Sequence, residues 1–367
     1  MSLNRPNNLA LILSFTAHVA EISKKILPEI RIDPFTGDYA IIAPKLAKKS
    51  NAFAKAEENT TKLPTSDSNC PFCTIKDKEN VMYTNEGGSR SNWKVIGLEN
   101  LFSVFAPKKE YEEFKPTSYL GINSIPASGQ AGLIIENKNH ILTENVNSLE
   151  QYQETIKAYK DLYKQMKNSD NSDYIKYISI FKNKGEKANA SQIHPHSQIF
   201  ALPVVPPMID KRIQIAKDYY LKNNENLFDA AIKQEKIDKK NIVFENNDYI
   251  LITPYASKTP YEMRIIPKFQ SSKFEDITQN QSDNLAEILR ESVKRLEIVK
   301  TNDLSYNYVF NFAPVNSDDS KEIDKYYRWT VDLIPREKPI GGFDWLSGIY
   351  AINKEPSDCA EELRNAG

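Results

Sequence analysis

The pattern of hydrophobic and polar residues occurs twice along the chain. Each copy begins with two short apolar runs, Asn100–Pro107 and Gly132–Glu136 in the first and Asn247–Pro254 and Met263–Pro267 in the second. Short apolar runs rich in β-branched and aromatic side chains are typical of strands. The pattern therefore predicts a pair of strands at the start of each copy.

A long amphipathic segment follows each pair of predicted strands. In Leu149–Asn168 the apolar side chains recur every three or four residues, which places them on one face of a helix. Ser148 and Gln151 have the spacing of a capping box at the start of this helix. The corresponding segment in the second copy is Gln281–Val299. The sequence therefore predicts one long helix in each copy.

Two further predicted strands close each copy. They are Tyr174–Phe181 and His194–Pro203 in the first copy and Tyr306–Phe312 and Tyr326–Pro335 in the second. The polar stretch Asp210–Lys240 lies between the copies and is expected to link them. Antiparallel strands with a crossing helix form an α+β half-barrel. We therefore expect one α+β fold that is duplicated within the chain.

Charge and composition restrict the class of protein. The 367 residues include 48 Lys and Arg against 49 Asp and Glu, a formal net charge of −1. A nearly neutral chain gives no support to a nucleic-acid partner. The residues are 40% hydrophobic and 26% charged, as in soluble globular proteins.

One apolar run near the N-terminus has some features of a targeting segment. Leu9–Ala20 has 12 residues, too few to span a bilayer. The charged stretch Glu21–Lys25 follows without a clean small-residue cleavage site. Three Cys are also too few for a secreted disulfide framework in a chain of this length. We therefore expect a cytoplasmic protein without a membrane span, in which Leu9–Ala20 forms a surface helix.

The strongest candidate for catalysis is the sequence HPHSQ, residues 194–198. Alternate residues of a strand share a face, so His194, His196 and Gln198 are predicted to project together. An imidazole with a proton held at one nitrogen is a good nucleophile or acid–base catalyst at the other. The Gln198 amide can donate to a phosphoryl oxygen where charge develops. A single strand histidine is more often structural, but three polar side chains on one face of an apolar strand favour catalysis.

The second candidate is the CxxC pair Cys70 and Cys73, which fits half of a zinc site, a redox pair or a chance spacing. A redox CxxC normally opens a helix, whereas this pair lies in a polar loop. Zinc prefers four ligands. The remaining Cys and His residues that could complete such a site are His18, His140, His194, His196 and Cys359.

Two of these histidines are the expected partners of the CxxC pair. His140 directly follows a first-copy strand, and His194 adjoins the candidate nucleophile His196. Cys70, Cys73, His140 and His194 would form a closed Cys2His2 zinc site that fixes the strand carrying His196. Ahead of that strand, the polar loop from Phe181 to Ser191 has the composition of a phosphate-binding loop, which taken alone is a weak signal.

Several motifs together carry a family resemblance. They are RIDPFTG at residues 31–37, CPFC at 70–73, FKNKG at 181–185 with Ser191 after it, HPHSQ at 194–198, ALPVVPP at 201–207 and GGFD at 341–344. In these motifs the chain resembles the galactose-1-phosphate uridylyltransferase family of the histidine-triad superfamily, with features of the ADP-glucose phosphorylase branch. The resemblance covers nearly the whole chain, roughly residues 29–364.

The resemblance implies a fold, a reaction and site residues. It implies duplicated histidine-triad-like domains and a ping-pong reaction in which a covalent nucleotidyl-histidine forms on His196 with Gln198 as the stabilising amide. The implied zinc ligands are Cys70, Cys73, His140 and His194, and the implied partners are a nucleotide sugar, a sugar phosphate or phosphate, and a second subunit in a homodimer. The implied substrate contacts are Asn100, Asn183, Ser191, Lys49 and Lys338.

Some positions depart from the family pattern. The family's Arg-x-x-Arg is Leu46 and Lys49 here, and a Lys point charge does not replace the bidentate Arg fork on phosphate. Leu101 stands where the family has an Asp that binds ribose, as in the phosphorylase branch. The second copy has Tyr326, Arg328 and Thr330 in place of HPHSQ, so we expect it to be non-catalytic.

The leading hypothesis is therefore a zinc-containing nucleotidyltransferase that moves a nucleoside monophosphate from a UDP-hexose to a hexose 1-phosphate. The alternatives are an ADP-sugar phosphorylase, a nucleotide hydrolase and an inactive nucleotide-binding relative. The expected organisation is an N-terminal extension over residues 1–28, a catalytic domain over 29–209, a linker over 210–240 and a non-catalytic domain over 241–367.

Overall fold

The computed structural model describes residues 27–44, 66–75, 80–85, 88–140, 147–169, 172–300, 304–337 and 340–367. Three features of the sequence lie outside these residues. They are the apolar run Leu9–Ala20, the pair Leu46 and Lys49 that replaces the family's two Arg, and Lys338; Lys49 and Lys338 are both predicted substrate contacts. In the described part of the chain, no helix is both long enough and apolar enough to cross a membrane.

Ten strands form one continuous antiparallel sheet in the order β10-β11-β12-β14-β13-β8-β9-β7-β4-β3. In chain order these are β3 (Val81–Thr84), β4 (Ile96–Glu99), β7 (Gln130–Ile135), β8 (Tyr177–Lys184), β9 (His196–Leu202), β10 (Ile242–Glu245), β11 (Tyr249–Ile252), β12 (Met263–Pro267), β13 (Tyr306–Asn311) and β14 (Thr330–Pro335). Each half supplies five strands, and the halves meet where β8 pairs with β13. The duplicated α+β fold is confirmed, and its two half-barrel sheets share an edge.

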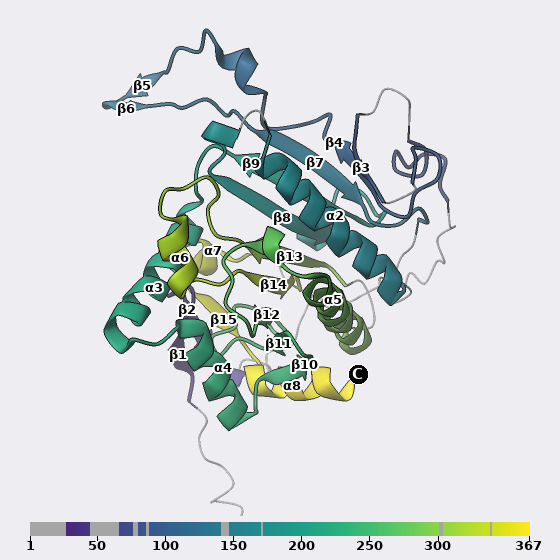
Figure 1. Ribbon diagram of the computed structural model, residues 1–367. Helices are drawn as coiled ribbons and strands as arrows, with labels where there is room; N and C mark the ends of the chain where they lie inside the picture. Colours follow the sequence, from purple (N-terminus) through teal and green to yellow (C-terminus); the bar gives the residue numbers. More distant parts are fainter. Residues whose placement is uncertain are drawn as a thin grey trace, which may run out of the picture.

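Two long helices cover one face of this sheet. They are α2 (Leu149–Lys167) and α5 (Gln279–Val299), which lie side by side in Figure 1. Ser148 caps the first through the backbone N–H of Gln151, and Thr278 forms a capping box at the start of the second. Apolar side chains of both helices pack with alternate residues of the strands in one core, and each fully buried large side chain contributes about 1.5–3 kcal/mol.

The opposite face of the sheet is covered differently in the two halves. In the second half, α3 (Pro207–Asn223) and α4 (Leu227–Asp238) pack on it together with Phe35. The stretch 210–240, expected to be a linker, therefore consists largely of these two helices. In the first half, a loop containing Cys70 and Phe72 packs on the β4 and β7 side of this face.

The remaining elements lie around the sheet. They are β1 (Glu29–Ile32), β2 (Tyr39–Ile42) and β15 (Tyr350–Ile352) in a small three-stranded sheet, the hairpin β5 (Ser118–Tyr119) and β6 (Ile122–Asn123), the helices α6 (Ser320–Tyr326), α7 (Gly342–Ser347) and α8 (Pro356–Asn365), and the 3-10 turns η2 (Lys108–Tyr111), η4 (Ser172–Tyr174), η5 (Glu186–Ala188) and η6 (Phe274–Asp276). In Figure 1 the hairpin projects from the first half, away from the sheet.

The prediction of a strand over Asn100–Pro107 is wrong. The strand that corresponds to β11 is β4, which ends at Glu99. The Asn100 side chain accepts the backbone N–H of Phe102 at 3.0 Å, a turn that ends the strand. The side chain of Phe102 is then 90% exposed, so the apolar character of this run does not reflect burial in the sheet.

Two further strand predictions began too early. His194 and Pro195 precede β9, which starts at His196, so His194 does not share the strand face with His196 and Gln198. In the second half, Tyr326 ends helix α6, and β14 begins only at Thr330. In both places the predicted strand begins before the backbone reaches the sheet.

Candidate active site and metal centre

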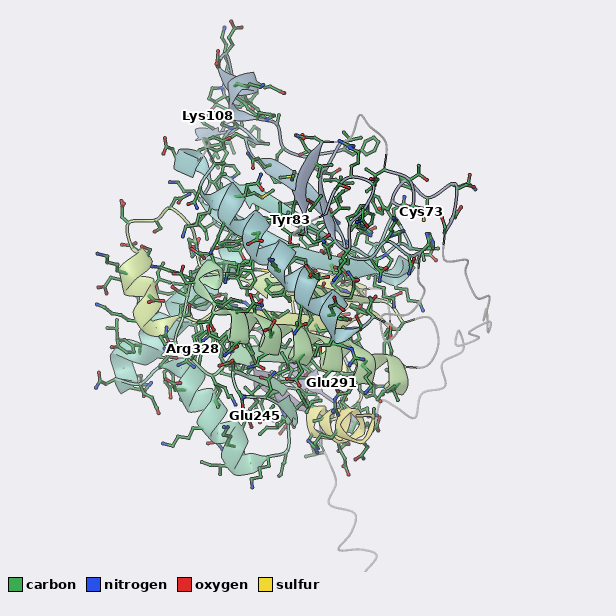
Figure 2. All side chains as sticks on the ribbon, turned by 45° about the vertical axis from the view of Figure 1, so that its right-hand side comes forward. Cys73, Tyr83, Lys108, Glu245, Glu291 and Arg328 are labelled. Atoms are coloured by element: carbon green, nitrogen blue, oxygen red, sulfur yellow. The ribbon has the colours of Figure 1, made fainter. Side chains whose placement is uncertain are left out.

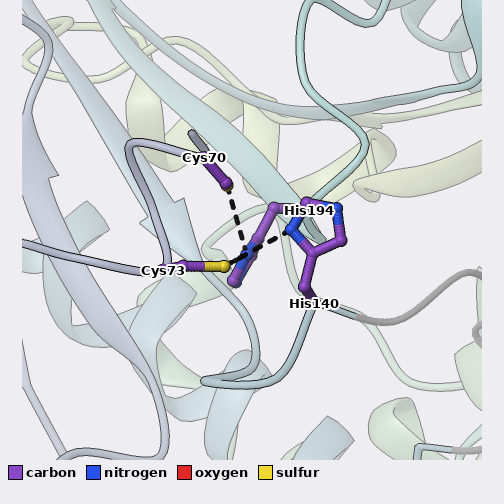
Figure 3. A group of neighbouring side chains, drawn as sticks. All are labelled: Cys70, Cys73, His140 and His194. Carbon is purple, nitrogen blue, oxygen red and sulfur yellow. Dashed lines mark hydrogen bonds between the residues drawn. The ribbon is translucent and has the colours of Figure 1, made fainter. Parts of the chain in front are cut away.

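The four side chains predicted to bind a metal lie together (Figure 3). Cys70 and Cys73 lie on the loop before β3, His140 follows β7, and His194 precedes β9. The Cys73 Sγ lies 3.4 Å from the His140 Nδ1 and 3.5 Å from the His194 Nδ1, and the Cys70 Sγ lies 3.7 Å from the His194 Nδ1. All four ligand atoms lie within 4.8 Å of one another.

The three sulfur–nitrogen separations fit a tetrahedral metal site. With metal–sulfur and metal–nitrogen bonds of the usual zinc lengths, a sulfur and a nitrogen ligand lie ~3.6 Å apart. The three measured sulfur–nitrogen distances, 3.4, 3.5 and 3.7 Å, bracket this value. Burial raises the pKa of the Cys70 thiol, and a bound cation would reverse that effect by stabilising the thiolate. The four side chains therefore can hold one metal ion.

A backbone carbonyl fixes the orientation of His194. Its Nε2 lies 2.7 Å from the carbonyl oxygen of Asn137, which can only accept, so Nε2 carries the proton and donates it. The lone pair of the neutral ring is then on Nδ1, the atom that faces both cysteines. Metal-binding histidines are commonly held in this way by their second nitrogen.

His196 is the first residue of β9 and is 4% exposed. Its Nδ1 lies 2.8 Å from the carbonyl oxygen of His194, so Nδ1 donates and the lone pair of the neutral ring is on Nε2. The ring of Phe72, from the CxxC loop, lies 5.2 Å from the His196 ring between centroids. The backbone carbonyl of His194 and the Cys70–Cys73 loop therefore both position the His196 ring.

Gln198 and Asn183 share a face of the sheet with His196. Ile199 and Ala201 of β9 pack against the helices, so His196 and Gln198 point to the opposite face. Phe181 of β8 pairs with Gln198, and two residues further along this register Asn183 lies opposite His196. The structure thus brings an imidazole and two amides together on adjacent strands.

The loop between β8 and β9 requires glycine at its start. Gly185 has a φ of +80°, and a Cβ there would lie 2.2 Å from the Ser305 Oγ. Asn189 adopts the left-handed conformation with a φ of 61°, and the loop then leads to exposed Ser191, five residues before His196. Ser191 therefore flanks the site on the loop that was predicted to bind phosphate.

The other predicted contacts are less close in the fold. Asn100 lies just past β4, with β7 between that strand and β9, and its backbone N–H donates to the Ala131 carbonyl at 2.9 Å. Lys49 and Lys338 lie outside the described residues. Three of the five predicted substrate contacts, Asn100, Asn183 and Ser191, therefore lie in the part of the chain that the structure describes.

The second half has a different set of side chains at the corresponding position. Arg328 donates to Asp229 at 2.6 Å, to Gln270 at 2.8 Å and to the carbonyl of Pro267 at 3.2 Å. In Figure 2, Arg328 and Cys73 lie on different sides of the molecule. Within the described residues, the Cys70 cluster is the one group of side chains arranged to hold a metal.

Sequence reasoning missed three contributors to the site: the carbonyl of Asn137, the Phe72 ring and, from the second half, Asn307. Asn307 pairs with Asn183 across the boundary between β8 and β13. A backbone carbonyl has no sequence signal, and Asn307 is 124 positions away from Asn183. The position of Phe72 between the two cysteines was the one available clue.

Comparison with known proteins places the chain in a family. Residues 17–206 match the model of the galactose-1-phosphate uridyl transferase N-terminal domain, and residues 212–344 match that of the C-terminal domain. An ADP-glucose phosphorylase of Arabidopsis thaliana is 30% identical over 340 residues, 92% of each chain. A galactose-1-phosphate uridylyltransferase of Thermotoga maritima is 21% identical over 92% of this chain and 98% of its own.

Solved structures agree with these matches. The crystal structure of an Arabidopsis thaliana ADP-glucose phosphorylase with bound ADP-glucose has a TM-score of 0.76 and 26% identity, over 92% of this chain and 99% of that chain. A uridylyltransferase structure has a TM-score of 0.69 and 24% identity, over 93% and 98% of the two chains. The resemblance in the sequence motifs is thus confirmed, and the chain belongs to the galactose-1-phosphate uridyl transferase family.

Proposed function

We propose that the protein is a nucleotidyltransferase that moves a nucleoside monophosphate from a UDP-hexose to a hexose 1-phosphate. The Nε2 lone pair of His196 attacks the α-phosphorus, a P–N bond forms, and the P–O bond to the departing hexose 1-phosphate breaks. A second sugar phosphate then attacks the same phosphorus, and the P–N bond breaks. The observation that carries the proposal is the hydrogen bond from the His196 Nδ1 to the His194 carbonyl, which directs the lone pair to Nε2.

Neutral amides near His196 suit the charge that develops during transfer. Gln198 and Asn183 carry N–H donors and no charge, and both lie on the same sheet face as His196. We assign to them the hydrogen bonds to the phosphoryl oxygens, which are worth most where water is excluded. Asn100 is assigned to the nucleoside, and Ser191, Lys49 and Lys338 to the phosphates and the sugar.

A second candidate is ADP-sugar phosphorolysis, with inorganic phosphate as the acceptor. It is favoured by the 30% identity to an ADP-glucose phosphorylase, against 21% to the uridylyltransferase of Thermotoga maritima. Leu101 supports the same branch, because an apolar residue there is shared with it. The two candidates use the same covalent step on His196 and differ in the base and in the acceptor.

The proposed metal is zinc, bound by Cys70, Cys73, His140 and His194. Two thiolates and two imidazoles in a closed tetrahedral set are typical of structural zinc sites. Bound zinc would stabilise the fold around β9, the strand that carries His196. The proposed reaction at His196 would be carried out by protein side chains and not by the metal. A cytoplasmic location is proposed with it, because a reducing compartment keeps both cysteines available as ligands.

A homodimer is proposed as the working assembly. Residues 101–125, here called the arm, include the projecting hairpin β5–β6 and carry several highly exposed apolar side chains. These include Phe102 at 90%, Leu120 at 86%, Tyr119 at 79% and Ile122 at 75% exposure. An exposed group of large apolar side chains usually marks an interaction surface, and a second copy would cover it symmetrically.

The test follows the label from a nucleotide sugar that carries ³²P in the α-phosphate. Wild-type protein should become labelled with UDP-glucose, and hexose 1-phosphate should discharge the label. Discharge by phosphate after ADP-glucose would instead establish the phosphorylase, and discharge by water a hydrolase. His196→Ala should abolish labelling and keep its metal, whereas His194→Ala should lose the metal. Full labelling of His196→Ala would refute the assigned nucleophile.

A further inference from the structure

A row of polar side chains crosses the boundary between the two halves and ends at the candidate nucleophile. Phe181 of β8 pairs with Gln198, and continuing this register by two residues puts Asn183 beside His196. Asn307 of β13 pairs with Asn183. Adjacent strands are about 4.8 Å apart, so Asn307 lies roughly 10 Å from the backbone of β9. Arg336, one residue beyond β14, completes the row. Two of the four residues in this row therefore come from the half that lacks the catalytic motif.

The hydrogen bonds in this row have a fixed direction. The Arg336 Nε donates to the Asn307 Oδ1 at 2.5 Å. The Asn307 Nδ2 donates to the Asn183 Oδ1 at 2.7 Å and to the carbonyl of Ala188 at 3.1 Å. A guanidinium can only donate and a carbonyl can only accept, so these two ends determine which way the Asn307 amide faces.

The orientation of Asn183 follows from that of Asn307. Because Asn307 presents N–H to it, Asn183 must accept with Oδ1, and its own Nδ2 then faces away from Asn307. No partner for this Nδ2 occurs among the described residues. Asn183 is half-buried, on the sheet face that carries His196. The amide is therefore fixed in the orientation that offers two N–H donors beside the candidate nucleophile.

We propose that Asn307 and Arg336 of the second half are positioning residues that hold the Asn183 amide with its N–H donors toward the phosphoryl group on His196. The inference rests on the proposed function, because it names what Asn183 binds there. A phosphoryl oxygen accepts hydrogen bonds, so the same amide turned by 180° would present a carbonyl oxygen and repel it. The second half, although without a nucleophile, thus determines the polarity of the active site.

Asn307→Asp reverses the direction of the hydrogen bond to Asn183 with little change in the shape of the side chain. The carboxylate still accepts from Arg336 but offers no donor, so Asn183 must turn and donate to it. We expect the rate of covalent labelling at saturating nucleotide sugar to fall about 100-fold or more, as when an oxyanion donor is lost. Asn307→Leu removes the same bonds to Asn183 and Ala188 without forcing the turn, and we expect a fall of about tenfold only.

The decisive result is which of the two variants, Asn307→Asp or Asn307→Leu, is labelled more slowly. If Asn307 only supports the fold, Asn307→Leu loses at least as much activity as Asn307→Asp, and the proposal is overturned. Arg336→Lys, which can still donate to Asn307, should label within about threefold of wild type, whereas Arg336→Met should be slower. Asn280→Asp, an exposed change of the same charge on α5, is the matched control and should label as wild type does.

A binding measurement separates this proposal from the proposed function. UMP and AMP are used as phosphate probes in calorimetry, and Asn307→Asp should bind the preferred one at least tenfold more weakly than Asn307→Leu. If wild-type protein binds a probe but is never labelled, the proposed nucleotidyl transfer is refuted. The probe affinities of the two Asn307 variants would still test the inference about the Asn183 amide. Equal affinity of the two variants, with equal labelling rates, would overturn the inference about Asn183.

Discussion

Two histidines only two positions apart use different ring nitrogens to bind a backbone carbonyl. His194 turns its Nδ1 to the cysteines because the Asn137 carbonyl takes its Nε2 proton. His196 uses Nδ1 to bind the His194 carbonyl, so its lone pair is on the other nitrogen. A single backbone carbonyl in each case selects the tautomer, which suits His194 to the proposed metal site and His196 to the proposed nucleophilic attack.

Removal of one metal ligand should affect the fold more than the chemistry. We expect Cys73→Ser to retain less than one equivalent of zinc and to unfold at lower urea concentration than wild type, because metal binding contributes to folding. Metal analysis and urea titration, with and without a chelator, measure this. Cys359→Ser is the control, because Cys359 lies outside the cluster. Wild type without zinc after purification in its presence would contradict the site.

Glu262 is a buried carboxyl outside the active site. Burial raises its pKa to about 7, with Asp332 adding to the shift and Arg264 opposing it. Its Oε2 accepts the backbone N–H of Lys258 at 2.5 Å. Because an unfolded Glu titrates near pH ~4.3, the folded chain binds the extra proton between these values. The contribution of Glu262 to the free energy of unfolding is therefore fully present below about pH 4 and is lost as the pH rises through 7.

Glu262→Gln should remove this loss. The amide mimics the protonated carboxyl and can still accept from Lys258, so we expect little change at pH 5 and a gain of up to about 3 kcal/mol in the free energy of unfolding at pH 8. Urea titrations at the two pH values measure the difference. A variant that is less stable than wild type at pH 8 would show that the carboxylate is net favourable there.

At the scale of elements, a buried cluster of polar side chains around Glu136 joins β7, β8, α2 and β13 next to β9. Glu136, just past β7, forms an ion pair with Lys182 of β8. Its Oε1 accepts from Tyr159 of α2 at 2.8 Å and from Tyr308 of β13 at 3.1 Å. The Glu136 N–H also donates to the Pro195 carbonyl at 3.0 Å. The group thus ties both halves to the segment between His194 and His196.

Lys182→Met should be strongly destabilising, because it leaves the Glu136 carboxylate buried without its cation. We expect the free energy of unfolding to fall by about 3–5 kcal/mol, measured by urea titration at pH 7. Lys94→Met breaks the exposed ion pair between Lys94 and Glu150 and should change stability little. A Lys182→Met variant as stable as the Lys94→Met control would contradict this role for the pair.

At the scale of the whole molecule, the two halves share one sheet and cannot act as independent domains. The pairing of β8 with β13 puts residues from both halves in one row, and α2 and α5 share one core. The second half therefore contributes residues to this row and to this core although it lacks the HPHSQ sequence. The arm, in contrast, makes the first half larger without adding to this core.

The arm should control the oligomeric state. We expect wild type to sediment as a dimer at micromolar concentration and Leu120→Asp to sediment as a monomer with unchanged zinc content, because a charge there opposes burial of the arm. Leu221→Asp, at a leucine that is 70% exposed on α3, is the matched control and should remain dimeric. Monomeric wild type, or dimeric Leu120→Asp, would contradict the proposed contact.

Local patterns explain which predictions were successful. The helices at Leu149 and Gln281 were predicted because their period of 3.6 residues and their caps are local properties. The Asn100–Pro107 strand was wrong because exposed Phe102 has the same local pattern as a buried residue. The clustering of Cys70, Cys73, His140 and His194 was predicted because few other ligands exist in the chain.

The sequence by itself determined the family, the duplicated α+β fold and the small set of residues available for metal binding and nucleophilic attack. These follow from residue types and short spacings, which can be recognised in the sequence without knowledge of distant contacts. Only the tertiary structure decided the tautomers of His194 and His196 and the amide orientation of Asn183. Each depends on a hydrogen-bond partner, which is either a backbone carbonyl or a residue of the other half. The fold brings these partners into contact, and they leave no local pattern in the sequence.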